Sequence, residues 1–305
     1  MSRLRLDPVR ASARTLGSAL AALALLVAGC SDDAPASKRP TTRAPAAPSA
    51  PTAPPDGPFL DYHDASKTQK KTEGTLRGGV QVGDWTFWHP SGSVAAKGAF
   101  VDGKTTGTWI EYHEDGSKRS ERSFVGGEPE GQFTLWYANG KVESLGAYRD
   151  GLRQGQWTDF HPDGKKKREG QYVEDAQDGA WTSWHPDGRL QSEAHFERGQ
   201  RVGTWKAWTA DGRQESEAGF AANLSEGPAS MWYPNGQLRA QIAYKNGIAE
   251  GEWREWHENG KLARAGRYVA GKREGPWEYF LEDGSPDPAQ TGAYAADQLQ
   301  AAPPK

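Results

Sequence analysis

The chain of 305 residues has one cysteine, two methionines and a single extended apolar run, which lies within the first 29 residues. One cysteine cannot form an internal disulfide, so hydrogen-bonded strands and side-chain packing must stabilise the fold. The apolar run, Leu16 to Ala28, is too short to span a bilayer comfortably. These deficits argue against a disulfide scaffold and against a transmembrane helix.

An excess of positive charge is also missing. The chain has 37 basic and 40 acidic residues. Removing residues 1–29 takes away four arginines and one aspartate, which leaves 33 and 39 and a net charge of −6. Nucleic-acid binding requires a basic face, so we expect no nucleic-acid partner.

The first 29 residues differ in composition from the rest. Four arginines, at positions 3, 5, 10 and 14, precede the apolar run, which ends in Val27-Ala28-Gly29-Cys30. This arrangement resembles the bacterial lipoprotein signal peptide, which implies cleavage after residue 29 and acylation of Cys30, for example with palmitate. The alternative is an ordinary secretory signal with a chance cysteine. Because Ser31 rather than Asp follows Cys30, the resemblance favours the outer over the inner membrane of a bacterial cell envelope.

Residues 30–58 comprise Cys30 and a linker rich in proline and alanine. Few of its side chains could enter a core, so we expect it to be disordered or to adopt polyproline-like conformations. It would tether a membrane-anchored Cys30 to the folded domain.

A glycine recurs every 24 residues, nine times, without insertion or deletion, at positions 83, 107, 131, 155, 179, 203, 227, 251 and 275. A bulky aromatic follows two residues later in eight copies, and another follows three residues after that in all nine. All 13 tryptophans lie in these two columns. A fixed period of this length indicates a repeat array.

Each copy contains two strand-like segments and two turns. Asp-Gly or Asn-Gly closes the first turn in most copies, which is a strong hairpin signal. We therefore predict an all-β, elongated antiparallel β-hairpin array of about eighteen strands. Residues 59–82 would form an N-terminal cap and half repeat, residues 83–298 the nine repeats, and residues 299–305 a disordered tail. The second turn is expected at Gly103 to Gly107 and its equivalents, where Asp175 and Asn223 replace the first glycine and should adopt left-handed conformations.

The pattern Gly-x-x-x-Gly-x-Trp-x-x-aromatic-x-x-Asp/Asn-Gly resembles the MORN repeat, and more closely its variant in bacterial proteins that include antitoxin-like members. The resemblance covers residues 72–284. It implies a β-hairpin scaffold that associates with membranes or other proteins and carries no catalytic residues to transfer.

Five histidines share one column, at positions 89, 113, 161, 185 and 257. Equivalent positions lie two strands apart, about 9.6 Å, which is too far for two imidazoles to bind one zinc. We therefore expect strand-end packing here, with no metal, no other cofactor and no catalytic site. Nowhere does a nucleophile–base pair stand out from the repeat.

The two aromatic columns should point to opposite faces, because Trp85 and Trp88 differ by three residues. A three-residue loop at Pro90 to Gly92 would place Trp88 on the face of Val94, Ala96, Gly98 and Phe100, whereas a two-residue loop would place Trp85 there. Proline at the second turn position favours the first alternative. The candidate binding face is then Trp85, Trp109, Trp157, Trp181, Trp205, Trp253 and Trp277.

Together these features predict a lipid-anchored, non-enzymatic envelope protein that acts as a protein-binding scaffold. The alternatives are a glycan- or cell-wall-binding module, because other wall-binding repeats also use glycine and tryptophan at similar periods, and an antitoxin-like protein.

Overall fold

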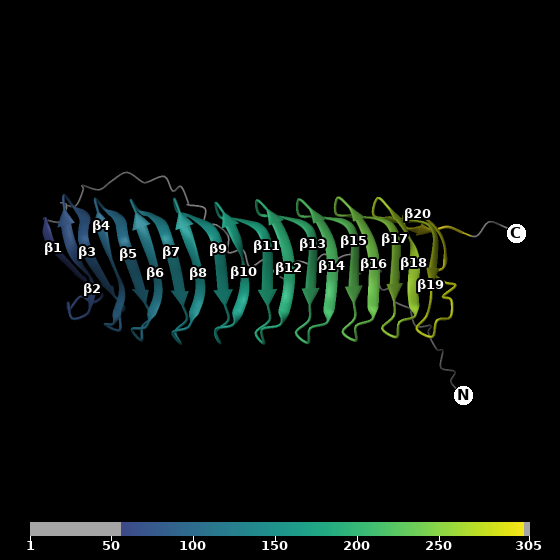
Figure 1. Ribbon diagram of the computed structural model, residues 1–305, viewed down its shortest axis with the longest axis horizontal. Helices are drawn as coiled ribbons and strands as arrows, with labels where there is room; N and C mark the ends of the chain where they lie inside the picture. Colours follow the sequence, from purple (N-terminus) through teal and green to yellow (C-terminus); the bar gives the residue numbers. More distant parts are fainter. Residues whose placement is uncertain (1–55, 302–305) are drawn as a thin grey trace, which may run out of the picture. The chain divides into compact units, whose positions relative to one another are not determined.

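The computed structural model describes residues 56–301, in which 21 β-strands follow one another in chain order, each antiparallel to the next (Figure 1). Successive strands are neighbours throughout, so the sheet is one continuous meander. The predicted all-β hairpin array is confirmed. The strands are β1 Gly57–Tyr62, β2 Lys70–Arg77, β3 Val80–Trp88, β4 Val94–Val101, β5 Lys104–Tyr112, β6 Lys118–Val125, β7 Glu128–Trp136, β8 Val142–Arg149, β9 Leu152–Phe160, β10 Lys166–Val173, β11 Ala176–Trp184, β12 Leu190–Glu197, β13 Gln200–Trp208, β14 Gln214–Ala221, β15 Leu224–Trp232, β16 Leu238–Lys245, β17 Ile248–Trp256, β18 Leu262–Val269, β19 Lys272–Tyr279, β20 Gly292–Ala295 and β21 Gln298–Leu299.

The first turn of each repeat has the predicted three-residue loop. In the first copy, the amide of His89 donates to the carbonyl of Ser93, the amide of Gly92 donates to the carbonyl of His89, and Gly92 has φ +89°. This is a tight turn followed by a residue in the left-handed region, which glycine adopts without a Cβ clash.

The second turn is shorter than expected. Between β4 and β5 it comprises only Asp102 and Gly103, both with positive φ, and Lys104 already pairs with Val101. Asp175 and Asn223 occupy the second position of this turn with φ +67° and +70°, as predicted for their left-handed column. The two-residue turn matches the right-handed twist of the strands, so the remaining residues can join β5.

The repeat glycine lies inside a strand. Gly107 has φ +63° within β5, at a point where the pairing with β4 jumps from Lys97↔Ile110 to Ala99↔Thr106. A bulge of this kind bends a strand and changes its twist. All nine glycines of the column have positive φ, so backbone geometry explains the most regular feature of the sequence.

The ends of the array complete the repeat pattern. At the N-terminal end, β1 starts at Gly57, inside the range expected for the linker, and Leu76 of β2 is buried. At the C-terminal end, two extra residues separate Gly284 from Tyr294, yet Tyr294 pairs with Gly275 as Phe100 pairs with Gly83. A loop with an isolated bridge between Phe280 and Pro286 accommodates the insertion.

A second register shift decides which side chains share a face. In the first repeat Trp88 pairs with Val94, but Phe87 pairs with Ala96, so Ala95 is left unpaired. This bulge shifts β4 by one residue. The face of Trp85 therefore carries Ala96, Gly98 and Phe100, and we call it the core face; the opposite face, with Thr86 and Trp88, is the second face.

Candidate binding surface

The column of Trp85, Trp109, Trp157, Trp181, Trp205, Trp253 and Trp277 lies on the core face. Five of its rings are buried, with exposed fractions from 1% for Trp277 to 7% for Trp157, and the other two are half-buried. This corrects the expectation of an exposed ladder. The three-residue loop was predicted correctly, but the bulge after Val94 reverses the face of every later residue in the strand.

Glycine makes this burial possible in a sheet of one layer. A Cβ added to Gly170 would lie 2.2 Å from the ring of Trp181, and Gly74, Gly98, Gly146 and Gly266 are covered in the same way by the tryptophan of the next repeat. The indole of Trp181 also donates to the carbonyl of Gln171 at 3.2 Å. The small residues thus leave room for a tryptophan ring that lies across the neighbouring strand.

The column of Gly98 holds glycine or alanine in six of its eight copies, and its two larger residues interrupt the aromatic packing. Within residues 56–301 the ring contacts form three runs, Phe59 to Phe124, Phe133 to Phe220, and Trp253 to Tyr294. The breaks coincide with Arg122, whose guanidinium lies over Phe133, and with Ile242, which pairs with Ala229 and Trp253. Trp253, whose ring lies opposite Ile242, has its Nε1 buried without a hydrogen-bond partner.

Charged groups on the core face are paired beside the rings. Arg168 Nε lies 2.5 Å from Asp159 Oδ2, and Ser144 Oγ donates to the same carboxylate at 2.6 Å. Arg264 and Glu255 form an equivalent pair in the repeat that begins at Gly251. Such pairs satisfy polar groups among packed rings.

The second aromatic column forms a half-buried row on the second face. We call this row the aromatic stripe; each of its nine rings is neither fully buried nor fully exposed. The bulge after Val94, which the sequence does not signal, determines its placement. Its members are Trp88, Tyr112, Trp136, Phe160, Trp184, Trp208, Trp232, Trp256 and Phe280.

The surroundings of the stripe change along the array. In the N-terminal half, lysine ammonium groups lie over Trp88, Trp136 and Trp184 at 5.4 to 5.7 Å from the ring centroids. Lys118 and Lys166 pair across their hairpins with the stripe residues Tyr112 and Phe160, and Val94 and Val142 take the same position in alternate repeats. Towards the C-terminal end this position holds Leu190, Gln214, Leu238 and Leu262. The stripe is therefore flanked by alternating lysine and valine at one end and mainly by leucine at the other.

A row of threonine and glutamate lies next to the stripe on the same face. Thr158 pairs with Glu169, and Thr182 pairs with both Glu169 and Glu193. The stripe thus offers aromatic faces beside hydroxyl and carboxylate groups.

The histidine column links neighbouring repeats. His185 Nε2 lies 2.8 Å from the carbonyl oxygen of Trp208, and the histidines at positions 89, 113, 161 and 257 make the same contact 23 residues ahead. Tyr137 and Tyr233 donate their hydroxyls to the equivalent carbonyl. The expected strand-end role is observed, with the addition of this hydrogen bond.

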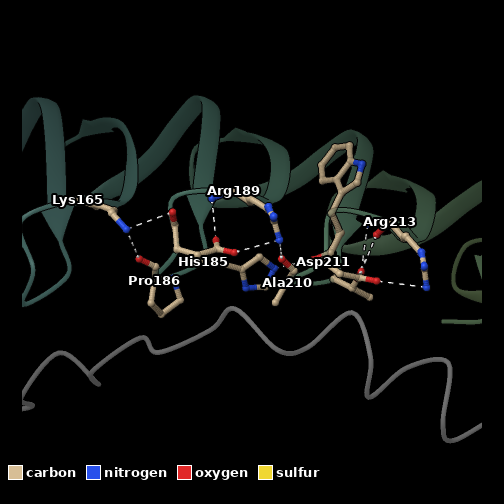
Figure 2. A network of polar contacts seen from close by, with 10 residues as sticks. Lys165, His185, Pro186, Arg189, Ala210, Asp211 and Arg213 are labelled. Carbon is tan, nitrogen blue, oxygen red and sulfur yellow. Dashed lines mark hydrogen bonds and ion pairs between the residues drawn. The ribbon is translucent and has the colours of Figure 1, made fainter.

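Basic residues after the turn glycine reinforce the same edge. Lys165 Nζ donates to the carbonyls of Pro186 and Asp187, and Arg189 donates to that of Ala210 (Figure 2). Arg213 likewise donates to the carbonyl of Pro234 in the following turn. Each repeat is thereby hydrogen-bonded to the next by side chains as well as by strands. This edge is structural, because its cations already contact carbonyl oxygens and turn aspartates.

Residues 56–301 contain no group of three or more His, Cys, Asp or Glu side chains that could hold a metal ion. No helix in that range is long and apolar enough to cross a bilayer. Cys30, the predicted lipidation site, lies outside the described residues.

The family of the MORN repeat variant matches residues 105–125, 129–150, 153–174, 177–198, 225–246 and 249–270. No curated protein matches the chain. Among solved structures, TcdB2-TccC3-Cdc42 is 12% identical, covers 79% of this chain and has a TM-score of 0.18. TcdB2-TccC3 without its hypervariable C-terminal region is 9% identical over 70% of the chain, with a TM-score of 0.18. The Photorhabdus luminescens Tc holotoxin pore is 12% identical over 74%, with a TM-score of 0.16.

This chain spans only 14–16% of the length of those three chains, and the TM-scores are too low to carry an argument. The six family matches fall on hairpins with the same register, the same positive-φ glycine and the same inter-repeat hydrogen bonds. The unmatched copies at Gly83, Gly203 and Gly275 repeat that geometry. Six of the nine repeats therefore match the variant form of the MORN repeat, and the other three share their hairpin geometry.

Proposed function

We propose that this protein is a lipid-anchored, non-catalytic scaffold of a bacterial cell envelope that binds a protein partner along the aromatic stripe. The observation that carries the proposal is the stripe itself, nine half-buried rings repeated along one face. Aromatic side chains contribute strongly to interfaces, and half-buried rings can bury their remaining exposed area against a partner without unfolding the core.

The C-terminal half of the stripe is the favoured contact region. Trp232 and Trp256 pair there with Leu238 and Leu262, whereas lysines lie over Trp136 and Trp184 in the N-terminal half. A photo-crosslinking residue at Trp232 should capture one dominant protein from the envelope of the native cell. The same residue at Lys206, on the same face outside the stripe, is the matched control. Equal capture from both positions would contradict the proposal.

Glycan binding is the second candidate, and the threonine and glutamate row beside the stripe favours it, because sugars stack on aromatic faces and hydrogen-bond to hydroxyls and carboxylates. Sedimentation of the purified protein with cell wall would support this candidate. The Trp208→Ala/Trp232→Ala variant should then remain in the supernatant.

The anchor has a separate test. Metabolic labelling with a fatty acid should label the native chain and leave Cys30→Ala unlabelled. Unchanged labelling of the variant would refute acylation at Cys30 and leave the stripe proposal untouched.

A further inference from the structure

One arginine of the core face lacks the counter-ion that its equivalents have. Arginine occupies the same column of the repeat at positions 153, 201 and 273. Arg153 Nε donates to Asp175 Oδ1 at 2.9 Å, and Arg273 Nε donates to Asp297 Oδ1 at 3.1 Å. Both carboxylates belong to the next two-residue turn along the array, where they have positive φ.

At Arg201, which pairs with Phe196 on the core face, the residue in that turn is Asn223. The side chain of Asn223 accepts a hydrogen bond of 2.8 Å from the Arg201 amide, so the turn contact is kept without the negative charge. The guanidinium donates only from Nη2, to the Asn223 carbonyl at 3.5 Å. Within residues 56–301, Nε and Nη1 of Arg201 therefore have no acceptor.

Aromatic rings pack against this guanidinium. Its Cζ atom lies 5.2 Å from the ring centroid of Trp205 and 4.6 Å from that of Phe220. Such contacts favour a cation at this position but supply no acceptor for its N–H groups. Arg201 and Trp205 are both half-buried, so part of each remains accessible to a ligand.

The surrounding core face supplies no carboxylate. On β11–β15, the side chains that pair on this face are aromatic, aliphatic or uncharged, apart from Arg201 itself. Burial lowers the pKa of Arg201. Burial also acts to lower the pKa of Arg273, but hydrogen bonds with Tyr279 and Asp297 raise that pKa overall. Arg201 is therefore partly removed from water without an anion that would offset the loss of hydration.

The repeat does not need arginine at this position. Gln177 and Ser225 occupy the column in the two adjacent repeats, where they pair with the preceding strand as Arg201 does. The other two arginines of the column each form an ion pair with an aspartate. A guanidinium that the backbone does not require, and that residues 56–301 leave without an anion, indicates an acceptor supplied from outside.

We propose that Arg201 binds the carboxylate of a ligand on the core face, and that the accessible part of Trp205 contacts the body of this ligand. A planar carboxylate matches the fork of a guanidinium, and it is the group that the same column uses at Asp175 and Asp297. One carboxylate balances one cation, whereas a phosphate dianion would need a second cation, and no other lies among the paired residues of this face on β11–β15. The site lies on the face opposite the aromatic stripe, so it depends neither on the stripe nor on acylation of Cys30.

The test is a titration of the full chain, labelled with nitrogen-15 and followed by NMR at the Nε–H signal of Arg201. Loss of this signal in Arg201→Gln assigns it, and the variant should fold because Gln177 is its counterpart in the preceding repeat. N-acetyl-glutamate α-amide, which has one carboxylate, should shift the signal saturably. N-acetyl-glutamine α-amide, its neutral counterpart, should leave the signal unchanged.

Substitutions separate a binding site from an arginine that only covers the rings. Asn223→Asp places a carboxylate in the turn, as in the pair of Arg153 and Asp175, and should abolish the response to the probe. Asn246→Asp adds the same charge to the two-residue turn of the next repeat; it is the matched control and should retain the response. Arg201→Lys should weaken binding, because lysine keeps the charge but lacks the planar fork.

Further probes distinguish the sources of the carboxylate. N-acetyl-phenylalanine presents a terminal carboxylate beside an aromatic ring, so tighter binding of this probe would assign the ligand to a chain terminus or a small aromatic acid. Tighter binding of the glutamate probe would assign it to an acidic side chain. Inorganic phosphate that binds more tightly than either probe would overturn the assignment to a carboxylate. An Arg201 signal that no probe shifts, or that shifts equally in Asn223→Asp, would overturn the proposal and leave the aromatic stripe untouched.

Discussion

Two stretches of the array cover the same backbone with different side chains. From Phe133 to Phe220 the core face is an unbroken run of ring contacts, in which tryptophans lie on Gly146 and Gly170. From Ala229 to Ala249 it is mainly aliphatic. The buried side chains of this second stretch are Ala229, Met231, Ala240, Ile242 and Ala249.

The backbone is nevertheless the same in both stretches. Gly179 pairs with Phe196 as Gly227 pairs with Tyr244, and Trp181 faces Ala194 as Ala229 faces Ile242. The large residue has moved from one strand to its partner. Burial among these neighbours raises the pKa of Tyr244 to about 12. The comparison indicates that turns, bulges and inter-repeat hydrogen bonds specify the repeat, and that the core accepts more than one packing of similar volume.

The largest effect on stability should come from replacing a core-face tryptophan of the aromatic stretch by alanine, the residue that the aliphatic stretch has at Ala229. We expect Trp157→Ala to lower the free energy of unfolding by about 4 kcal/mol, because Gly170 across the pair cannot fill the cavity. Urea unfolding measures the loss. Trp136→Ala, in the aromatic stripe of the preceding repeat, is the control and should cost clearly less. Equal costs for the two variants would contradict the assignment of core and second face.

Adding a side chain at a glycine that lies under a tryptophan ring should have the next largest effect. Gly170→Val places a side chain where the ring of Trp181 lies, and it disturbs the hydrogen bond from that indole to Gln171. We expect a loss of about 3 kcal/mol in the free energy of unfolding. Ala194→Val in the next repeat, where the column already holds alanine, should cost less. A Gly170→Val variant as stable as the parent would show that the ring can move aside freely.

Placing the larger residue on the partner strand, as in the aliphatic stretch, should recover part of the stability lost in Trp157→Ala. In the double variant Trp157→Ala/Gly170→Ile, isoleucine lies opposite alanine, as Ile242 does opposite Ala229. We expect the double variant to be about 1–2 kcal/mol more stable than the sum of the single changes implies. A double-mutant cycle in urea measures this coupling. Strict additivity would mean that the exchange of size across the pair is incidental.

The smallest effect concerns the aspartates in the three-residue turns, which both stretches share. Hydrogen bonds from Ser117, Thr209 and Ser285 lower the pKa values of Asp115, Asp211 and Asp283, and the Lys165 amide lowers that of Asp163. These carboxylates contribute stability that is present above their unfolded pKa of about 3.9 and is lost as the pH falls through the lower folded values.

Replacing all four aspartates by asparagine should therefore flatten the loss of stability below about pH 4 and change little at pH 7. Asparagine already occupies this column at positions 139, 235 and 259, where it keeps the turn hydrogen bond. Thermal unfolding across that pH range is the measurement. If the stability of the variant falls below pH 4 as steeply as that of the parent, other carboxylates are responsible for the fall.

Much of this architecture could be predicted because it repeats. The hairpin turns, the left-handed Asp175 and Asn223, and the small residues under tryptophan all follow from local conformational rules that act in every copy. The predicted binding face was wrong for a different reason. One unpaired residue, Ala95 and its equivalents, leaves no compositional mark, yet it exchanges the faces of the two aromatic columns.

The sequence by itself determined the period, the two turns per repeat, the antiparallel order of the strands and the family, because each depends on residues close together in the chain. Only the tertiary structure decided that the repeat glycine is a bulge within a strand, that the first aromatic column is buried, and that the second forms the accessible stripe. Those outcomes depend on how neighbouring strands pair, and a shift of one residue in that pairing moves a side chain from one face of the sheet to the other.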